Sequence, residues 1–471
     1  MLNAVKLTVT IRCMHIANKN QQQVGVTLIL MTFIFALAAT SYLLLSQNAQ
    51  QFKVAQNNQT NQALATAKQA LLAYSAEKIS GMVYGALLVC NSDCPRPGDL
   101  PCPDKDNDGS ADPPCSGNSL GRLPWKTMGL GDLRDGFGER LWYAVSSQYK
   151  NNPRILPLNS DSLGTISYRN NSGNLLHDAE SYTGLAAVVI SPGPPLTRFD
   201  NFIQIRTIAT INIAKNYLDI AFSEDNTSFN DGSSNGFISG QIEIANKKIL
   251  NDTIMPVTRA DMNTVMEKRV LSEVMQAILY NTCQTRADMK IRECRNIAGS
   301  ANNDYLPDPA AVNDATCLGN ALISNTDCSS SAGLSLGRIP VGGNVGPTNN
   351  LGWENQESNS ILQGKSLNNW FQQNAWRELI FYAVAPACTQ PTKNCTGLGF
   401  LNLNGALTSG NNKKVILLAS GSALVAQNRS AIINKTALSN YLEDANFSPL
   451  DNNYLRYTHN AIRNDRPLSI P

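Results

Sequence analysis

Two segments of the chain have hydrophobic positions at helical spacing, and short apolar runs follow each segment. The helical positions are Leu64, Ala67, Leu71 and Tyr74 in the first segment and Val270, Val274, Ala277 and Ile278 in the second. Runs of strand length, rich in β-branched and aromatic residues, cover 141–145, 185–190, 202–213 and 415–418. Because regular βαβ alternation and a glycine-rich phosphate loop after a strand are missing, the pattern predicts an α+β fold with antiparallel sheet.

An apolar run of 23 residues without a charge, 24–46, lies ahead of the first helical segment. As a helix it would measure roughly 34 Å, against a bilayer core of about 30 Å. Lys6, Arg12 and Lys19 precede it, which predicts a cytoplasmic N-terminus and places the rest of the chain on the far side of the membrane. A cleaved secretory signal is the alternative, but its apolar region is usually about 7–15 residues long.

Length and charge narrow the class of protein. A chain of 471 residues exceeds what one hydrophobic core usually serves, which suggests two or three domains. The charged fraction is 16%, below the roughly 25% typical of soluble domains. Since 38 basic and 36 acidic residues are evenly spread, the chain has no basic patch for the phosphate backbone, and we predict no nucleic-acid partner.

The chain repeats itself in order. The segments 69–72, 119–124, 139–145, 187–193, 216–219 and 251–252 return as 276–279, 335–340, 378–384, 415–421, 440–443 and 464–465. SLGRLP and SLGRIP are the most similar pair. We therefore predict two duplicated α+β heads, 58–257 and 258–471, with the boundary near Pro256, just before the helical segment 259–280.

Cysteine spacing indicates an oxidising compartment. Cys13 precedes the apolar run, and the ten cysteines after it fall into five close pairs: Cys90 and Cys94, Cys102 and Cys115, Cys283 and Cys294, Cys317 and Cys328, and Cys388 and Cys395. An even number of closely spaced cysteines favours local disulfides that staple the heads. Zinc is the rival interpretation, but paired CxxC knuckles are absent and the chain has three histidines.

The junction Gly25-Val26-Thr27-Leu28-Ile29-Leu30 resembles the prepilin peptidase site of type IV pilins and type II secretion pseudopilins. The family pattern is a short basic leader that ends in glycine, followed by a hydrophobic helix whose second half passes under an α+β head. Here residues 1–25 would be the leader, 26–57 the transmembrane and filament-core helix, and Gly25 and Val26 the two sides of the cut. The sequence departs from the pattern at Val24 and at residues 21–23, which are glutamines, and at Leu30, where the family has glutamate.

The resemblance implies a function and a location. It implies a structural subunit that is cleaved by prepilin peptidase and methylated, lies in the inner membrane with heads in the periplasm or on the cell surface, and assembles with other pilins or pseudopilins. The family's glutamate neutralises the N-terminal ammonium of a neighbouring subunit. A subunit with Leu30 at this position therefore resembles a minor pseudopilin that caps the tip of a type IV pilus or type II secretion pseudopilus. A plain signal-anchor helix is the alternative.

An acidic loop follows Cys102. Asp104, Asp106 and Asp108 alternate before Gly109, and Asp112 lies shortly after. Carboxylates at alternate positions followed by glycine are typical of a calcium loop, so we predict Ca²⁺ bound by these four aspartates. A full EF-hand is excluded because its twelfth position is Cys115, and a solvated acidic turn is the alternative.

The sequence contains few residue patterns that are typical of a catalytic site. His15 lies in the leader, His177 and His459 have unmatched surroundings, and no Gly-x-Ser-x-Gly elbow occurs. We predict that the protein is not an enzyme. Two function classes remain: a structural pilin-like subunit, and a membrane-tethered binding module or adhesin whose heads recognise a surface glycan or a protein.

Overall fold

The computed structural model describes residues 23–77, 96–179, 181–230, 236–282, 308–321, 327–343, 370–388, 400–404, 413–447, 452–456, 460 and 462–470, without the side chains of 23–28, 41–49, 276, 277, 279–282, 342, 343, 387 and 470. The chain divides into two compact units, Met1–Gln59 and Thr60–Pro471. Helix and antiparallel sheet both occur, which confirms the mixed α+β class.

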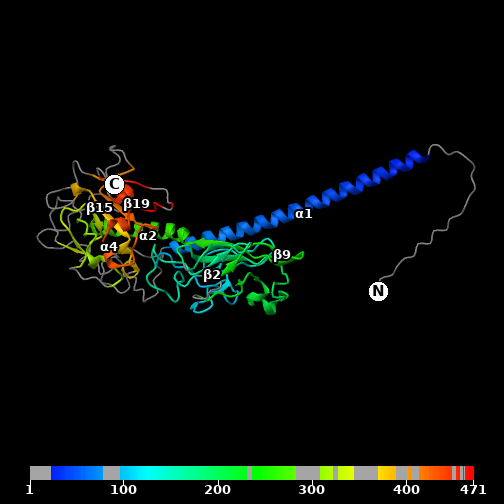
Figure 1. The fold of residues 1–471 in the computed structure, drawn as a ribbon, viewed down its shortest axis with the longest axis horizontal. Coiled ribbons are helices and arrows are strands. Elements are labelled where there is room, and N and C mark those ends of the chain that lie inside the picture. The colour runs from blue at the N-terminus through cyan, green and yellow to red at the C-terminus, as the bar shows by residue number, and fades with distance from the viewer. Residues whose placement is uncertain are drawn as a thin grey trace, which may run out of the picture. The chain divides into compact units, whose positions relative to one another are not determined.

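The first helix, α1 (Gln23–Ala76), is 54 residues long and uninterrupted (Figure 1). It contains the predicted helical segment and the apolar run before it. In the second unit, Leu64, Ala67 and Leu71 of α1 are buried in the hydrophobic core. Among the described residues, no helix combines the length and the apolar character that a membrane crossing requires.

The second unit contains two four-stranded sheets, and their strand orders are equivalent. The first has the order β1-β2-β5-β11, with strands Leu120–Arg122, Trp142–Val145, Leu185–Ser191 and Thr253–Thr258. The second has the order β13-β15-β17-β19, with strands Leu336–Arg338, Ile380–Val384, Val415–Ala419 and Arg466–Ile470. Neighbouring strands are antiparallel throughout both sheets.

Equivalent residues of the repeated sequence segments pair in the same register in the two sheets. Arg122 pairs with Trp142 in the first sheet, and Arg338 pairs with Phe381 in the second. Trp142 in turn pairs with Ile190, as Phe381 does with Leu418. The repeated SLGR and E-x-x-x-Y-A-V segments therefore occupy equivalent places.

Helix α2 (Arg259–Thr282) directly follows β11 and packs against β5, β11, β17 and β19. Its start is fixed by a reciprocal cap, because Thr258 N–H donates to Asp261 Oδ2 (2.8 Å) and Asp261 N–H donates to Thr258 Oγ1 (3.1 Å). One hydrophobic core joins α1, α2 and both sheets. Pro256, expected at a boundary, lies inside β11 at the edge of the first sheet, where a missing N–H is tolerated.

The prediction of a strand over 202–213 is wrong. This segment forms turns and the 3-10 helix η1 (Ile208–Thr210), and Ile203 and Ile205 are exposed. Gln204 and Arg206 hold the segment through side-chain hydrogen bonds to Leu218 O and Asn216 O (3.3 and 3.0 Å) instead of a ladder. Apolar residues here do not mark a buried face.

Short elements complete the second unit. The remaining strands are β3 (Tyr168–Arg169), β4 (Leu175–His177), β6 (Ile220–Ala221), β7 (Glu224–Asp225), β8 (Phe237–Ile238), β9 (Ile242–Ile244), β10 (Lys247–Leu250), β12 (Ser329–Ser330), β14 (Gly342–Gly343), β16 (Asn402–Leu403) and β18 (Asn453–Tyr454). The short helices are α3 (Trp370–Gln373), α4 (Ile432–Lys435), α5 (Asp444–Phe447), η2 (Ala214–Asn216), η3 (Ala315–Cys317), η5 (Trp376–Glu378), η6 (Pro386–Cys388) and η7 (Leu438–Asn440).

Candidate functional site

Three of the four predicted aspartates come together in the loop that precedes β1. One carboxylate oxygen from each of Asp104, Asp106 and Asp108 lies within 4.8 Å of the other two. Asp104 is buried and the other two are exposed. Asp112 has a different place, since its Oδ2 accepts the backbone N–H groups of Lys105 (2.6 Å) and Asp106 (3.3 Å) and closes the loop.

Backbone donors hold the carboxylates of this acidic loop in position. Asp104 accepts from Asn107 N–H (2.6 Å) and Gly109 N–H (2.7 Å), and Asp108 accepts from Ser110 N–H (2.6 Å). Gly109 has a φ of 92°, and a Cβ there would lie 2.5 Å from the ring of Trp125, so this turn requires glycine. The disulfide Cys102–Cys115 encloses the loop.

The loop carboxylates have different electrostatic surroundings. Burial raises the pKa of Asp104, while the N–H of Ser110 lowers the pKa of Asp108. Calcium binds oxygen ligands at about 2.3–2.6 Å, so ligands on opposite sides of the ion lie at most about 5 Å apart. The three oxygens meet this limit, so the cluster could hold a metal ion.

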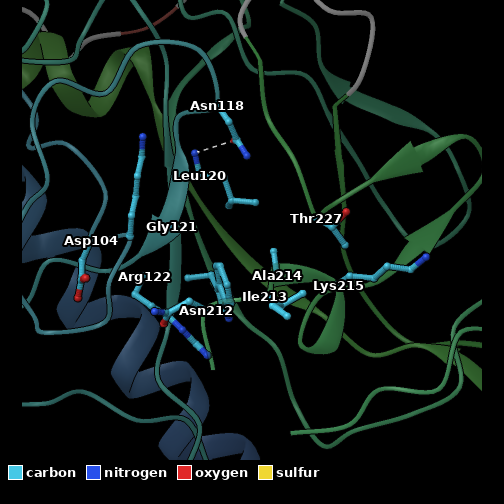
Figure 2. A pocket seen from close by; sticks show the side chains of 12 residues that line it. Asp104, Asn118, Leu120, Gly121, Arg122, Asn212, Ile213, Ala214, Lys215 and Thr227 are labelled. Carbon is cyan, nitrogen blue, oxygen red and sulfur yellow. Dashed lines mark hydrogen bonds between the residues drawn. The ribbon is translucent and has the colours of Figure 1, made fainter. Parts of the chain in front are cut away.

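A cavity of about 450 Å³ adjoins the acidic loop. Asp104 and Lys105 line it from the loop, Leu120 and Arg122 from β1, and the segment 212–215 from the opposite side (Figure 2). It offers both apolar and polar walls, as ligand pockets do.

Arg122 is a buried cation at the wall of this cavity. Its guanidinium lies 4.1 Å from the ring centres of both Trp142 and Tyr217. Its Nη1 donates to Arg140 O (2.9 Å) and its Nη2 to Ile211 O (3.0 Å). Burial lowers the pKa of Arg122 to about 10, so the side chain is charged at neutral pH.

Each repeat contains a buried network of carboxyl, amide and guanidinium groups that sequence reasoning missed. In the first repeat, Asp252 Oδ2 accepts from Asp219 N–H and Asn226 Nδ2, both at 2.8 Å. In the second, Asp465 Oδ2 accepts from Glu443 N–H (2.9 Å) and Asn446 Nδ2 (3.3 Å). The repeated motifs Asn-Tyr-Leu-Asp/Glu and Asn-Asp contain these carboxyl residues, but the motifs alone did not indicate that the side chains are buried and hydrogen-bonded to one another's segments.

The guanidinium groups of the two networks also correspond. Arg206 Nη1 donates to Gly193 O (2.6 Å), and Arg429 Nη1 donates to Gly421 O (2.9 Å). Gln204 and Gln427, each two residues earlier, accept from these arginines. A shared Gln-x-Arg motif is the sequence feature that could have identified the pair.

The disulfide prediction is confirmed where the structure describes the residues. Cys102–Cys115 and Cys317–Cys328 are bonded, with Cα–Cα distances of 5.5 and 4.6 Å, and Cys388 is disulfide-bonded too. The other predicted members, Cys90, Cys94, Cys283, Cys294 and Cys395, lie outside the described residues.

The predicted processing site lies at the start of the described chain. Gly25 and Val26 are in the first turns of α1, and residues 1–22 of the predicted leader lie outside the described part. Comparison of the chain with family models, with curated proteins and with solved structures finds no match.

Proposed function

We propose that this chain is a structural pilin-like or pseudopilin-like subunit that is anchored in the inner membrane by the N-terminal part of α1 and assembles into, or caps, a type IV pilus or type II secretion pseudopilus. Its partners are prepilin peptidase and other pilins or pseudopilins. The heads lie in the periplasm or on the cell surface.

The observation that carries this proposal is the exposure of the apolar N-terminal part of α1. Its large hydrophobic side chains are between 54% and 73% exposed: Ile29, Leu30, Met31, Phe33, Ile34, Phe35 and Leu37. Because successive residues point about 100° apart around a helix, these side chains cover roughly 240° of its circumference, and Thr32, Ala36 and Ala39 occupy the remainder. A helix that exposes large apolar side chains over most of its surface needs a lipid or protein environment. We propose membrane insertion for the whole run 24–46, of which the structure describes the side chains of 29–40.

The later part of α1 supports the same proposal. Leu64, Ala67 and Leu71 lie in one core with Tyr143 and Val189 of the first sheet. A long helix whose second half packs against an antiparallel sheet matches the architecture that the resemblance implies. Leu30 at the place of the family's glutamate favours a position at the tip.

N-terminal sequencing of the full-length chain, expressed in a host with active prepilin peptidase, tests the proposal. We expect the mature chain to begin at Val26. Gly25→Leu should block the cut and leave membrane insertion intact, whereas the matched control Val24→Leu should be cleaved like the wild type. A chain that still begins at Met1, while the host's own pilins are processed, contradicts the proposal and favours a membrane tether.

The second candidate function is a membrane-tethered binding module, and the cavity beside Arg122 favours it. Processing separates the two functions, because a tether needs no cut. We propose for either case that Asp104, Asp106 and Asp108 hold one calcium ion, which would draw three mutually repelling carboxylates together.

A further inference from the structure

The first repeat exposes several large apolar side chains in one short segment, 199–213, which we call the apolar loop. Five of these side chains are between 49% and 92% exposed: Phe199, Ile203, Ile205, Ile208 and Ile213. Single exposed apolar residues are ordinary on a protein surface, but a concentration of them marks an interaction surface. The apolar loop is therefore a candidate for a contact with a partner.

Hydrogen bonds from buried side chains fix the exposure of two of these isoleucines. Gln204 Nε2 donates to Asp219 Oδ1 at 2.8 Å, and Arg206 Nε donates to Asn216 O at 3.0 Å. These inward-held residues alternate with Ile203 and Ile205, which are 63% and 58% exposed. Because the loop is anchored at every second residue, the isoleucines face solvent as a consequence of its hydrogen bonds.

The second repeat contains an equivalent loop. Leu196 N–H donates to Gln204 Oε1 (3.1 Å), and Leu424 N–H donates to Gln427 Oε1 (3.0 Å). Residues 193–196 therefore correspond to 421–424, and residues 204–206 correspond to 427–429. The connection between these segments is longer in the first repeat, 197–203 against 425–426, and it contributes two of the five exposed apolar side chains.

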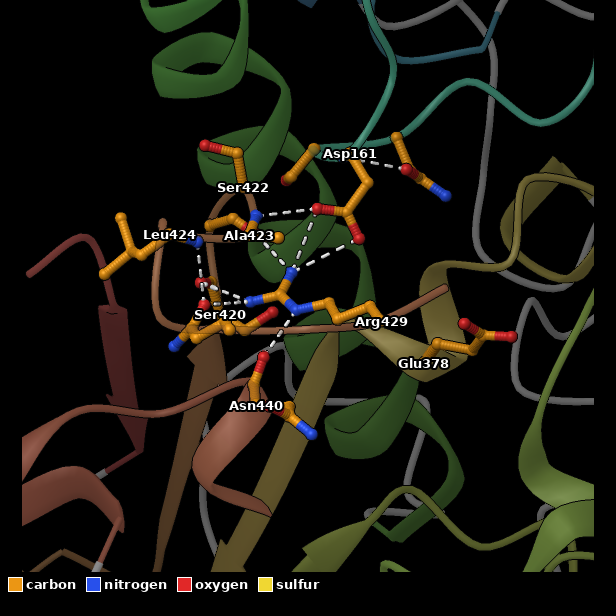
Figure 3. A network of polar contacts seen from close by, with 12 residues as sticks. Asp161, Glu378, Ser420, Ser422, Ala423, Leu424, Arg429 and Asn440 are labelled. Carbon is orange, nitrogen blue, oxygen red and sulfur yellow. Dashed lines mark hydrogen bonds and ion pairs between the residues drawn. The ribbon is translucent and has the colours of Figure 1, made fainter. Parts of the chain in front are cut away.

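In the second repeat this loop forms a contact with the first repeat. Ala423 N–H donates to Asp161 Oδ1 at 2.8 Å, and Arg429 Nη1 lies 3.1 Å from the same oxygen (Figure 3). In the first repeat Pro195, which has no N–H, takes the place of Ala423, and Arg206 takes the place of Arg429 but pairs within its own repeat. The equivalent surface of the first repeat thus replaces these polar contacts with exposed apolar side chains.

The charged side chains in and beside the apolar loop are paired with one another. Asp200 lies 3.4 Å from Arg198 and 3.3 Å from Lys215, and Arg206 lies 3.2 Å from Glu139. Anionic membranes are recognised by clusters of basic residues, and the paired charges of this segment form no such cluster. The same pairing means that no excess charge opposes the approach of an identical surface, which favours a second copy of the chain over a lipid surface.

We propose that two copies of this chain associate through the apolar loop, with the loop of one copy packed on the same loop of the other. Symmetric pairs of this kind are the commonest homo-oligomers, and homodimer interfaces are richer in apolar side chains than other protein interfaces. The contact belongs to the head of the first repeat, so it does not depend on whether the N-terminal helix is processed. It adds a partner surface to either of the two function classes.

Sedimentation equilibrium of the full-length chain in detergent tests the contact. The loop variant Ile203→Asp/Ile208→Asp is compared with the wild type and with the matched control Ile432→Asp/Ile433→Asp, which changes two isoleucines of the second repeat that are 66% and 76% exposed. We expect the wild type and the control to dimerise with a dissociation constant of about 10 μM or lower, and the loop variant to dimerise at least about tenfold more weakly, because the contact would bury unpaired carboxylates. All three chains keep the N-terminal apolar run, so association through that helix would be equal, and circular dichroism checks the fold.

Mixing the chains separates a symmetric contact from a head-to-tail one. In a head-to-tail contact the loop variant would still offer its second, unchanged surface, so a tagged loop variant would capture untagged wild type as well as tagged wild type does. A symmetric contact predicts weak capture, and equal capture overturns the symmetry. A monomeric wild type overturns the contact and returns the apolar loop to a lipid surface or another protein. A loop variant that dimerises like the wild type, or a control that is weakened as much as the loop variant, overturns it as well.

Discussion

Arg429 Nη1 lies 3.1 Å from Asp161 Oδ1, which joins the guanidinium network of the second repeat to a loop of the first (Figure 3). The same carboxylate oxygen accepts the N–H of Ala423 at 2.8 Å. Arg429 is nearly buried, whereas the Asp161 side chain is one-third exposed. In the first repeat the equivalent Arg206 pairs within its own repeat, with Glu139 at 3.2 Å. In the second repeat, Arg429 therefore forms an ion pair with a loop of the first repeat, whereas Arg206 pairs within its own repeat.

Asp161→Asn should destabilise the protein by about 1–2 kcal/mol, because the buried Arg429 loses its charged acceptor. The control Asp444→Asn removes the carboxylate of an exposed pair with Arg463 and should cost less than about 0.5 kcal/mol. Urea denaturation followed by circular dichroism compares the two variants. Equal midpoints for both variants would show that the Asp161 link adds no stability.

Stability should fall as pH rises from about 4 to 6, in part because of Asp219 and Asp252. Burial raises the pKa of Asp219 to about 6, and burial together with Asp219 raises the pKa of Asp252 well above its usual value. The folded chain therefore retains protons that the unfolded chain releases in this range, and each unit of such a shift corresponds to about 1.4 kcal/mol. Denaturation midpoints measured at intervals across the range test this.

Asp252→Asn should make that pH dependence shallower, since Asp219 would lose its carboxyl neighbour while the amide oxygen still accepts from Asn226. Glu443 and Asp465 form the corresponding pair in the second repeat, where burial and Glu443 raise the pKa of Asp465. The double variant with Asp465→Asn should be shallower still. The exposed control Glu243→Gln should keep the wild-type slope. An unchanged slope in the double variant would contradict the assignment.

Calcium should stabilise the full-length chain through the acidic loop. At about ten times its dissociation constant, a ligand specific for the folded state adds roughly 1.4 kcal/mol. Asp106→Ala should abolish the shift in thermal midpoint because it removes one oxygen ligand. Asp112→Asn should keep most of the shift, because an amide oxygen can still accept the N–H groups of Lys105 and Asp106. No shift in the wild type, or the same shift in Asp106→Ala, would identify the loop as a solvated turn.

The elements that bury apolar faces were accessible from the sequence. Burial can be predicted from the helical spacing of Leu64, Ala67 and Leu71 and from the apolar run 185–190. Both sets of residues lie in the hydrophobic core. Close cysteine spacing and alternating aspartates are equally local patterns, so two disulfides and the acidic cluster followed from them.

Buried polar groups were not accessible in this way. Arg122 and Asp252 are buried, yet their residue types are typical of surfaces. Arg122 donates to the carbonyl of Ile211, and Asp252 accepts from the N–H of Asp219. No hydrophobic period or motif spacing in the sequence predicts these pairings. The edge strands β11 and β19 were missed for another reason: each contains a proline, which weakens a strand pattern although an edge strand tolerates it.

The glycine of each SLGR segment should be irreplaceable, because the backbone of the preceding loop crosses it closely. A Cβ on Gly121 would lie 2.6 Å from the carbonyl oxygen of Asp104, and a Cβ on Gly337 would meet the carbonyl oxygen of Ala310 more closely still. These loops are held to the strands by paired backbone hydrogen bonds, Asp104 with Arg122 and Ala310 with Arg338, so neither side can move away without losing them.

We therefore expect Gly121→Ala to cost about 2–3 kcal/mol, as overpacking of a tight contact does, and Gly337→Ala to cost at least as much. Gly131→Ala is the matched control, since no atom lies within 4 Å of a Cβ there. Urea denaturation of the three variants measures the differences. In the first repeat the strain would also displace Asp104, so Gly121→Ala should weaken calcium binding, whereas Gly337→Ala should leave it unchanged. Wild-type stability in both SLGR variants would contradict the close crossing of loop and strand.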